Sequence, residues 1–148
     1  MSYTQKFEEV HYVDLCVVPQ VKAFGAIAYT DWYLMSNYQR GQWILMTGTM
    51  TATSTVDLSL QQDILGDGAS AKAFDPAKAI TQLTQAGGDG NDLVGLQFRT
   101  EEMDVDGGFK YVRAGYTVGT ANCAIALLFI KFIANYVPVP TTTWTELI

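Results

Sequence analysis

The sequence predicts an all-β protein, an antiparallel β-sandwich or jelly roll with extended N- and C-terminal arms. Segments in which apolar and polar residues alternate recur along the chain, most clearly at 56–61. Turn-forming Gly, Asn and Asp residues separate these segments at short intervals. No long segment has a convincing helical pattern. About seven or eight short strands with such turns are typical of two packed antiparallel sheets.

Four strands are expected in the first part of the chain, over 8–18, 29–35, 42–53 and 56–61. The first should end at Pro19, since proline removes a backbone donor. In the third, period-two alternation places its residues on two faces. One face would carry Ile44, Met46, Met50 and Ala52, and the other Trp43, Leu45 and the threonines. In the fourth, Val56, Leu58 and Leu60 alternate with polar residues, as in a half-buried strand.

The middle of the chain is less regular. Residues 63–76 are rich in Gly and Asp and should form a loop. For 78–85 two interpretations stand: Asp75 and Pro76 favour a helical turn, whereas the β-branched content favours a strand, which we prefer.

The C-terminal half predicts three more strands. Residues 93–103 and 109–118 should pair as a hairpin closed by Asp104–Gly108, because Asp-Gly suits tight turns. Residues 121–134 are apolar on both faces, which favours a central strand over the rival helix. Apolar faces should comprise Val94, Leu96 and Phe98 in the first strand and Val112, Ala114, Tyr116 and Val118 in the second.

Length and composition indicate one domain over 1–148, with an N-terminal arm of about 1–28 and a C-terminal tail of about 137–148. Charged residues make up only 16% of the chain, which favours surface hidden against partner proteins. The net charge of −6 and the scattered basic residues argue against nucleic-acid binding. A polar N-terminus without a signal core, and apolar runs far below ~20 residues, predict neither export nor a membrane span.

Side chains capable of catalysis or metal binding are sparse. His11 is the only histidine and is expected to be an ordinary strand residue. Cys16 and Cys123 are expected to be free thiols, with a disulfide as the alternative if their strands are neighbours. Asp104 and Asp106 match only a fragment of a calcium loop, so a solvated loop tip is preferred over a calcium site. We therefore expect no enzyme, no catalytic residue, no metal and no cofactor.

Aromatic residues are the main candidates for an interaction site. Their ordinary interpretation is core packing, but Trp and Tyr are also enriched at the centres of protein interfaces. The candidate protein-contact residues are Trp32, Tyr33, Tyr38, Trp43, Tyr136 and Trp144. The last two lie near or in the Pro- and Thr-rich tail, which would act as an arm on a neighbouring molecule.

Four motifs follow one another between residues 40 and 133. They are an alternating Thr strand at 47–53, Val-Asp-Leu-Ser-Leu-Gln-Gln at 56–62, Lys-Tyr-Val-Arg at 110–113, and Thr-Ala-Asn-Cys-Ala-Ile-Ala at 120–126. This order resembles a broad group of small β-sandwich structural proteins of tailed bacteriophages, of the head-decoration or capsid-cement type. The chain departs from the group in its tail at 135–148 and in its aromatic N-terminal segment.

The resemblance implies a virion component on the capsid surface, assembled in the host cytoplasm. The expected function is a decoration or cement protein that binds the major capsid protein, or other virion proteins, and stabilises the head shell. A homo-oligomer, dimer or trimer, is also expected. The alternatives are a neck, tail or head-fibre component and, from another class, a carbohydrate-binding sandwich that stacks Trp32, Trp43 or Tyr38 on sugar rings.

Overall fold

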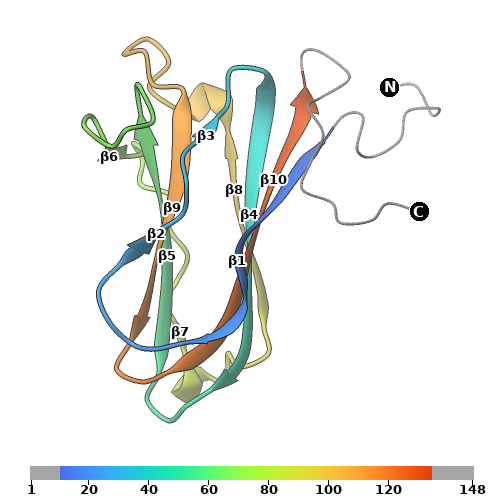
Figure 1. Cartoon of the computed structure of the whole chain (residues 1–148), viewed down its shortest axis with the longest axis vertical. Helices are drawn as coiled ribbons and strands as arrows, with labels where there is room; N and C mark the ends of the chain where they lie inside the picture. Colours follow the sequence, from blue (N-terminus) through green and yellow to red (C-terminus); the bar gives the residue numbers. More distant parts are fainter. Residues whose placement is uncertain (1–10, 135–148) are drawn as a thin grey trace, which may run out of the picture.

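A computed structural model describes residues 11–134 as two antiparallel sheets packed face to face (Figure 1). Of the described residues, 56% are in strands and 5% in helices, which confirms the predicted all-β sandwich. The first sheet has the order β1-β10-β4-β8, and the second has the order β2-β9-β5-β6, with β3 also on β9 and β7 also on β5.

The strands of the first sheet are long. Their bounds are β1 Tyr12–Lys22, β10 Cys123–Ala134, β4 Tyr38–Met50 and β8 Leu93–Arg99. In the second sheet β5 Thr55–Asp63 and β9 Tyr111–Gly119 are flanked by two-residue strands. These are β2 Ala28–Tyr29, β3 Tyr33–Leu34, β6 Lys72–Ala73 and β7 Leu83–Thr84, and two 3-10 turns cover Gln85–Gly87 (η1) and Thr100–Glu102 (η2).

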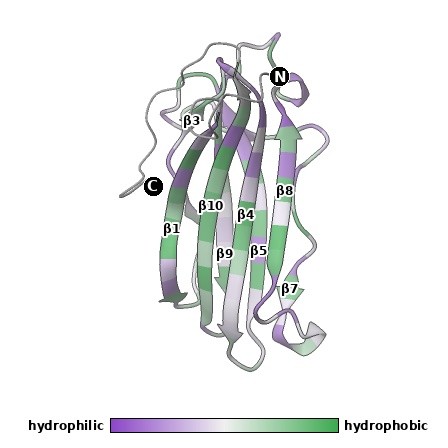
Figure 2. Ribbon diagram, turned by 90° about the vertical axis from the view of Figure 1, so that its right-hand side faces the viewer, coloured by the Kyte–Doolittle hydropathy of each residue, from purple (hydrophilic) through white to green (hydrophobic). Residues whose placement is uncertain are grey.

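The core lies between the sheets and follows from the alternation in the sequence. Val56, Leu58 and Leu60 of β5 are buried, as the sequence predicts, and so are the inner residues of β9. Across from them the rings of Trp43 and Phe129 stack with centroids 4.1 Å apart. Apolar residues are dense along β10 in the view onto the first sheet (Figure 2). Burial of these aromatic and branched side chains drives the two sheets together.

The first strand differs from its prediction. β1 does not stop at Pro19 but continues to Lys22, and its pairing with β10 is irregular between Val17 and Gln20. β1 is an edge strand, where a residue without a backbone donor is tolerated. Residues 12–22 of the expected N-terminal arm are therefore part of the first sheet; residues 1–10 and the tail at 137–148 lie outside the described residues.

The predicted hairpin is wrong. β8 pairs with β4 in the first sheet, whereas β9 pairs with β5 in the second, so the loop at 104–108 crosses between the sheets. β10 lies between β1 and β4, which confirms the central strand and excludes the rival helix. Local alternation identified β8 and β9 as strands but did not determine their partners.

Smaller differences occur elsewhere. The predicted strand at 29–35 is two short strands, β2 and β3, which pair with successive parts of β9. Of 78–85, only Leu83–Thr84 forms a strand, and Ala79 makes one isolated bridge to Ser59. In β4 the pairing with β10 shifts between Cys123 and Ile125, so Met50 is buried on the Trp43 face, contrary to the predicted faces.

Candidate interaction surface

The structure separates the predicted aromatic contact residues. Tyr33, Tyr38 and Trp43 are buried in the core, so they cannot form an exposed contact surface. For these three, the ordinary interpretation as core packing is the correct one. Trp32 is partly exposed. Tyr136 and Trp144 lie outside the described residues.

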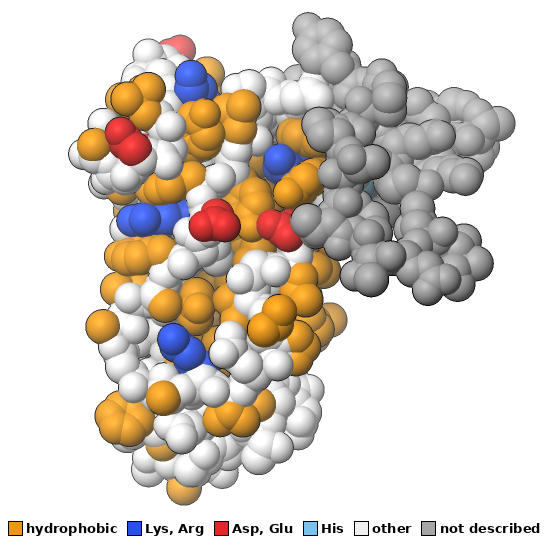
Figure 3. Space-filling model, viewed as in Figure 1, with side chains coloured by type: hydrophobic (Ala, Val, Ile, Leu, Met, Phe, Trp, Pro, Cys, Tyr) orange, Lys and Arg blue, Asp and Glu red, His pale blue; other side chains and the backbone are white. Residues whose placement is uncertain are grey.

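Exposed apolar side chains gather instead along one edge of the sandwich. β1, the segment after it, β2 and β3 lie toward the viewer in Figure 1, and hydrophobic side chains are frequent over this region in Figure 3. Val21 is 70% exposed and Phe24 is 61% exposed. We call this region the front surface; its exposed members are Leu15, Val18, Val21, Phe24, Ile27, Tyr29 and Leu34. Exposed apolar side chains clustered in this way are typical of protein contact sites.

Most of this surface was not predicted from the alternation of apolar and polar residues. In β1 the apolar residues Leu15, Val17, Val18 and Val21 do not keep to one parity, so some of them must face outward. That loss of strict alternation around Pro19 is the signal that could have revealed it. Exposure of Phe24 and Ile27 depends on how the connection to the second sheet runs, which no local pattern records.

Beside the front surface, an arginine is held between two aromatic rings. The Arg113 guanidinium carbon lies 3.8 Å from the ring centre of Tyr29 and 4.4 Å from that of Trp32. Its Nε and Nη2 atoms donate to Oε1 of Gln61 at 3.0 and 2.7 Å. Tyr29 packs closely over Gly115, where a Cβ atom would approach its ring to 2.9 Å. Trp, Tyr and Arg in a rigid cluster are the residue types that contribute most to protein interfaces.

A buried carboxylate holds the loop next to this cluster. Asp63 Oδ2 accepts the backbone N–H groups of Gly66, Asp67 and Gly68 at 2.7–3.1 Å, and Oδ1 accepts that of Ser70 at 3.0 Å. Burial by itself raises the pKa of Asp63, but these hydrogen bonds outweigh it and hold the pKa below its usual value. A Cβ atom on Gly68 would lie 3.8 Å from the Trp32 indole nitrogen, so this loop adjoins Trp32.

A buried ammonium lies near the other end of the front surface. Lys131 Nζ lies 4.1 Å from the ring centre of Tyr12 and 4.6 Å from that of Tyr38, and it donates to the Leu34 carbonyl oxygen at 3.4 Å. Burial lowers the pKa of Lys131 to about 8, although the Asp14 carboxylate opposes this shift. The Lys131 side chain of β10 thus holds the backbone of β3 at Leu34.

The remaining predicted groups are placed as follows. His11 directly precedes β1, with its ring centre 6.2 Å from that of Phe132. Cys16 and Cys123 are both free thiols, and β1 places Lys22, not Cys16, opposite Cys123, so the disulfide alternative is wrong. Burial raises the pKa of Cys16 to about 12, and its sulfur lies 3.2 Å from the Tyr33 hydroxyl.

The acidic loop has its own partners. Asp104 Oδ2 accepts from the Lys72 ammonium at 2.6 Å, and Oδ1 accepts from the Gly107 N–H at 2.9 Å. Because the Lys72 ammonium lies where a calcium ion would have to contact Asp104, this geometry favours the loop-tip interpretation over the calcium site. Within residues 11–134, no three His, Cys, Asp or Glu side chains are grouped so that they could hold a metal ion. Nor is any helix in that range long and apolar enough to cross a membrane.

No model of a known protein family matches the chain, and no curated protein matches it either.

Proposed function

We propose that the chain is a non-enzymatic structural protein of a virion, a capsid decoration or cement protein that binds and stabilises the phage head shell through the front surface. The observation that carries this proposal is the concentration of exposed apolar residues from Leu15 to Leu34 along one edge of a rigid sandwich. Apolar surface of this kind costs solubility unless a partner covers it.

The strand order supports the same proposal. We interpret β1-β10-β4-β8 packed against β2-β9-β5-β6 as a jelly roll, because consecutive long strands change sheets at β4 to β5, β5 to β8, β8 to β9 and β9 to β10. Jelly rolls are common in viral capsid and lectin domains. A shared fold alone does not establish a function, so the contact surface and the sequence resemblance carry more weight.

Cement function follows physically from several contacts made at once. A small sandwich, here a dimer or trimer, touches several shell subunits and resists their separation. The net charge of −6 suits docking on a basic protein surface and disfavours contact with the packed genome. The tail at 137–148 would enlarge the contact, so its deletion should weaken shell binding without unfolding the sandwich.

Binding to purified heads that lack the protein tests the proposal. Val21→Asp should lower shell occupancy about tenfold or more, because it places a charge in the apolar contact. Leu93→Asp is the matched control, since Leu93 is equally exposed at 70% but lies on β8 at the opposite edge of the first sheet. Equal occupancy by both variants and the unchanged protein would refute the front surface as the contact.

A neck, tail or head-fibre position is the second candidate. The same exposed edge could serve such a site, and copy number separates the two: decoration proteins number in the hundreds per particle, whereas neck rings hold few copies. Carbohydrate binding has less support, because Trp43 and Tyr38 are buried and Arg113 already lies against the Trp32 ring. A glycan array with the isolated protein would detect it.

A further inference from the structure

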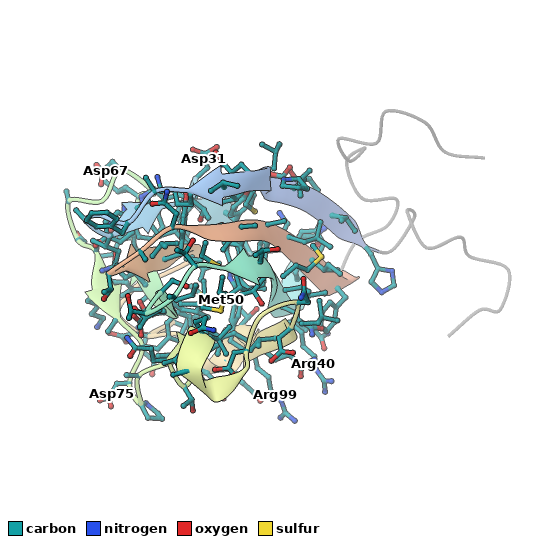
Figure 4. All side chains as sticks on the ribbon, turned by 90° about the horizontal axis from the view of Figure 1, so that it is seen from below. Asp31, Arg40, Met50, Asp67, Asp75 and Arg99 are labelled. Carbon is teal, nitrogen blue, oxygen red and sulfur yellow. The ribbon has the colours of Figure 1, made fainter. Side chains whose placement is uncertain are left out.

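A second feature lies on the side of the molecule away from Asp31 and Asp67. In Figure 4, Arg40 and Arg99 lie near each other on that side. Two cavities, of about 390 and 210 Å³, open there, and both are lined by these two arginines. We call this region the arginine cradle; besides the arginines, its charged members are Lys78, Glu101 and Glu102.

The two arginines oppose each other across the sheet. Arg40 of β4 and Arg99 of β8 are direct Cα partners in the antiparallel ladder, and both are exposed. Like charges directly opposite on neighbouring strands destabilise a sheet. In a chain with 9 basic and 15 acidic residues, such a pair is not a consequence of composition.

The nearby carboxylates do not neutralise both arginines. Glu101 accepts from Arg99 Nη1 at 3.0 Å. Glu102 is engaged by the Lys78 ammonium at 2.7 Å and by the backbone N–H of Arg99 at 2.6 Å, and the Lys78 contact holds the pKa of Glu102 below its usual value. Within residues 11–134, Arg40 takes part in no ion pair. The Arg40 guanidinium, which lines both cavities, is thus available to bind a ligand.

The ion pair between Arg99 and Glu101 indicates which chemical group that ligand carries. A carboxylate already lies on Arg99, but its side chain is 72% exposed and that of Arg99 is 58% exposed, so the pair is weak and replaceable. Guanidinium groups bind carboxylates through parallel hydrogen bonds. A long polyphosphate requires a basic surface much larger than the one that Arg40, Arg99 and Lys78 provide.

We propose that the arginine cradle binds carboxylate side chains of an acidic segment of a partner protein. Arg40 and Arg99 supply the guanidinium donors, and a ligand carboxylate takes the place of Glu101 in the larger cavity. This contact lies on the side of the molecule away from Asp31, and therefore away from the front surface, so it would give the protein a second, separate contact site. It does not depend on the proposed cement function.

Titration of the full chain with a hexaglutamate peptide tests the proposal, with the side-chain N–H signals of the arginines followed by NMR. Arg40 and Arg99 signals should shift to saturation with one peptide per chain, and added salt should weaken binding. Arg40→Gln should lower the affinity about tenfold or more. Lys110→Gln removes one charge from an exposed residue that lines neither cavity, and should change the affinity less than about twofold.

Three results would overturn the proposal. One is an equal loss of affinity in Lys110→Gln, which would show attraction by overall charge alone. Another is saturation of the arginine signals by inorganic phosphate but not by the peptide. The third is a tenfold gain in affinity when Glu8 and Glu9, just upstream of His11, are both changed to Gln, which would assign the cradle to the chain's own N-terminal segment. No phage particle is used, so the outcome is independent of the shell-binding assay.

Discussion

Asp63 and Lys131 are both buried ions, and both have lowered pKa values, but the same direction means opposite things for a carboxylate and an ammonium. For Asp63 it means that the protein favours the charged form in spite of burial. For Lys131 it means that the protein disfavours the charged form. The two sites differ in what surrounds the ion.

Four backbone N–H groups point at the Asp63 carboxylate within 3.1 Å. Lys131 has two tyrosine rings within 4.6 Å and one long hydrogen bond to a carbonyl oxygen. Directed donors therefore offset the loss of water, whereas ring faces offset it only in part. Both ions hold backbone near the front surface: Asp63 holds the loop at 64–70, and Lys131 holds Leu34.

The largest effect is expected from Asp63→Asn. An amide presents hydrogens to N–H donors and leaves several of them unpaired, so the free energy of unfolding should fall by about 2–4 kcal/mol. Urea denaturation measures this change. Asp67→Asn is the control, because the exposed Asp67 carboxylate accepts one N–H group within residues 11–134, that of Ala69 at 2.9 Å. A similar loss in both variants would contradict the role assigned to Asp63.

The pH dependence of the same pair of variants sharpens the result. The folded-state pKa of Asp63 lies below its unfolded value of 3.8. The stability that its charge contributes is therefore present above pH 3.8 and is lost as the pH falls through the folded-state value. The stability difference between the unchanged protein and Asp63→Asn should shrink in that window and stay constant above about pH 5.

A smaller loss is expected from Tyr33→Phe, which changes the surroundings of Lys131 and leaves its charge in place. The Tyr33 hydroxyl donates to Asp14 Oδ2 at 2.6 Å and also contacts the Cys16 sulfur. Loss of this bond should cost about 1–2 kcal/mol in urea denaturation. The Asp14 carboxylate raises the pKa of Lys131, and it would be less well held without the Tyr33 hydroxyl. The pKa of Lys131, followed by NMR, should therefore also change; an unaltered pKa would show that the two groups are independent.

Lys131→Met should be neutral or stabilising, in contrast to Asp63→Asn. Replacement of a poorly compensated buried charge by an apolar side chain should leave the free energy of unfolding at pH 7 unchanged or raise it by about 1–2 kcal/mol. The folded-state pKa of about 8 lies below the unfolded value of 10.5, so the unfolded chain binds more protons between these values. The unchanged protein should therefore gain stability relative to Lys131→Met by about 1–2 kcal/mol from pH 7.5 to 9.5.

Lys131→Arg is the control for that pH dependence, because arginine stays charged throughout the range. It should lack the gain in stability and be less stable than Lys131→Met at every pH. A flat difference between the unchanged protein and Lys131→Met would show that the ammonium is as well compensated as the Asp63 carboxylate.

The smallest effect is expected from Lys72→Gln. This change breaks the Lys72–Asp104 ion pair at 2.6 Å, but the two side chains are 46% and 41% exposed. Water and salt screen such pairs, so denaturation curves of the two proteins should overlap within error. A clear loss of stability would show that the strength of an ion contact in this protein does not depend on its burial.

The amino-acid sequence by itself determined the fold class and most strand positions. Alternation at Val56, Leu58 and Leu60 and at 112–118 predicts buried faces that the structure confirms. The apolar stretch at 121–134 predicts a central strand, and β10 is one. These features follow from the period-two geometry of a strand, which depends only on neighbouring residues.

The tertiary structure decided which strands pair and which aromatic residues are exposed. The sequence predicted a hairpin of β8 and β9, yet the two belong to different sheets. It could not show that Tyr33 and Trp43 meet in the core, that Tyr29 and Trp32 enclose Arg113, or that Arg40 opposes Arg99. The contacts of Arg113 and of Arg40 with Arg99 join residues far apart in the chain. The formation of all three depends on the register and packing of whole sheets, which local patterns do not encode.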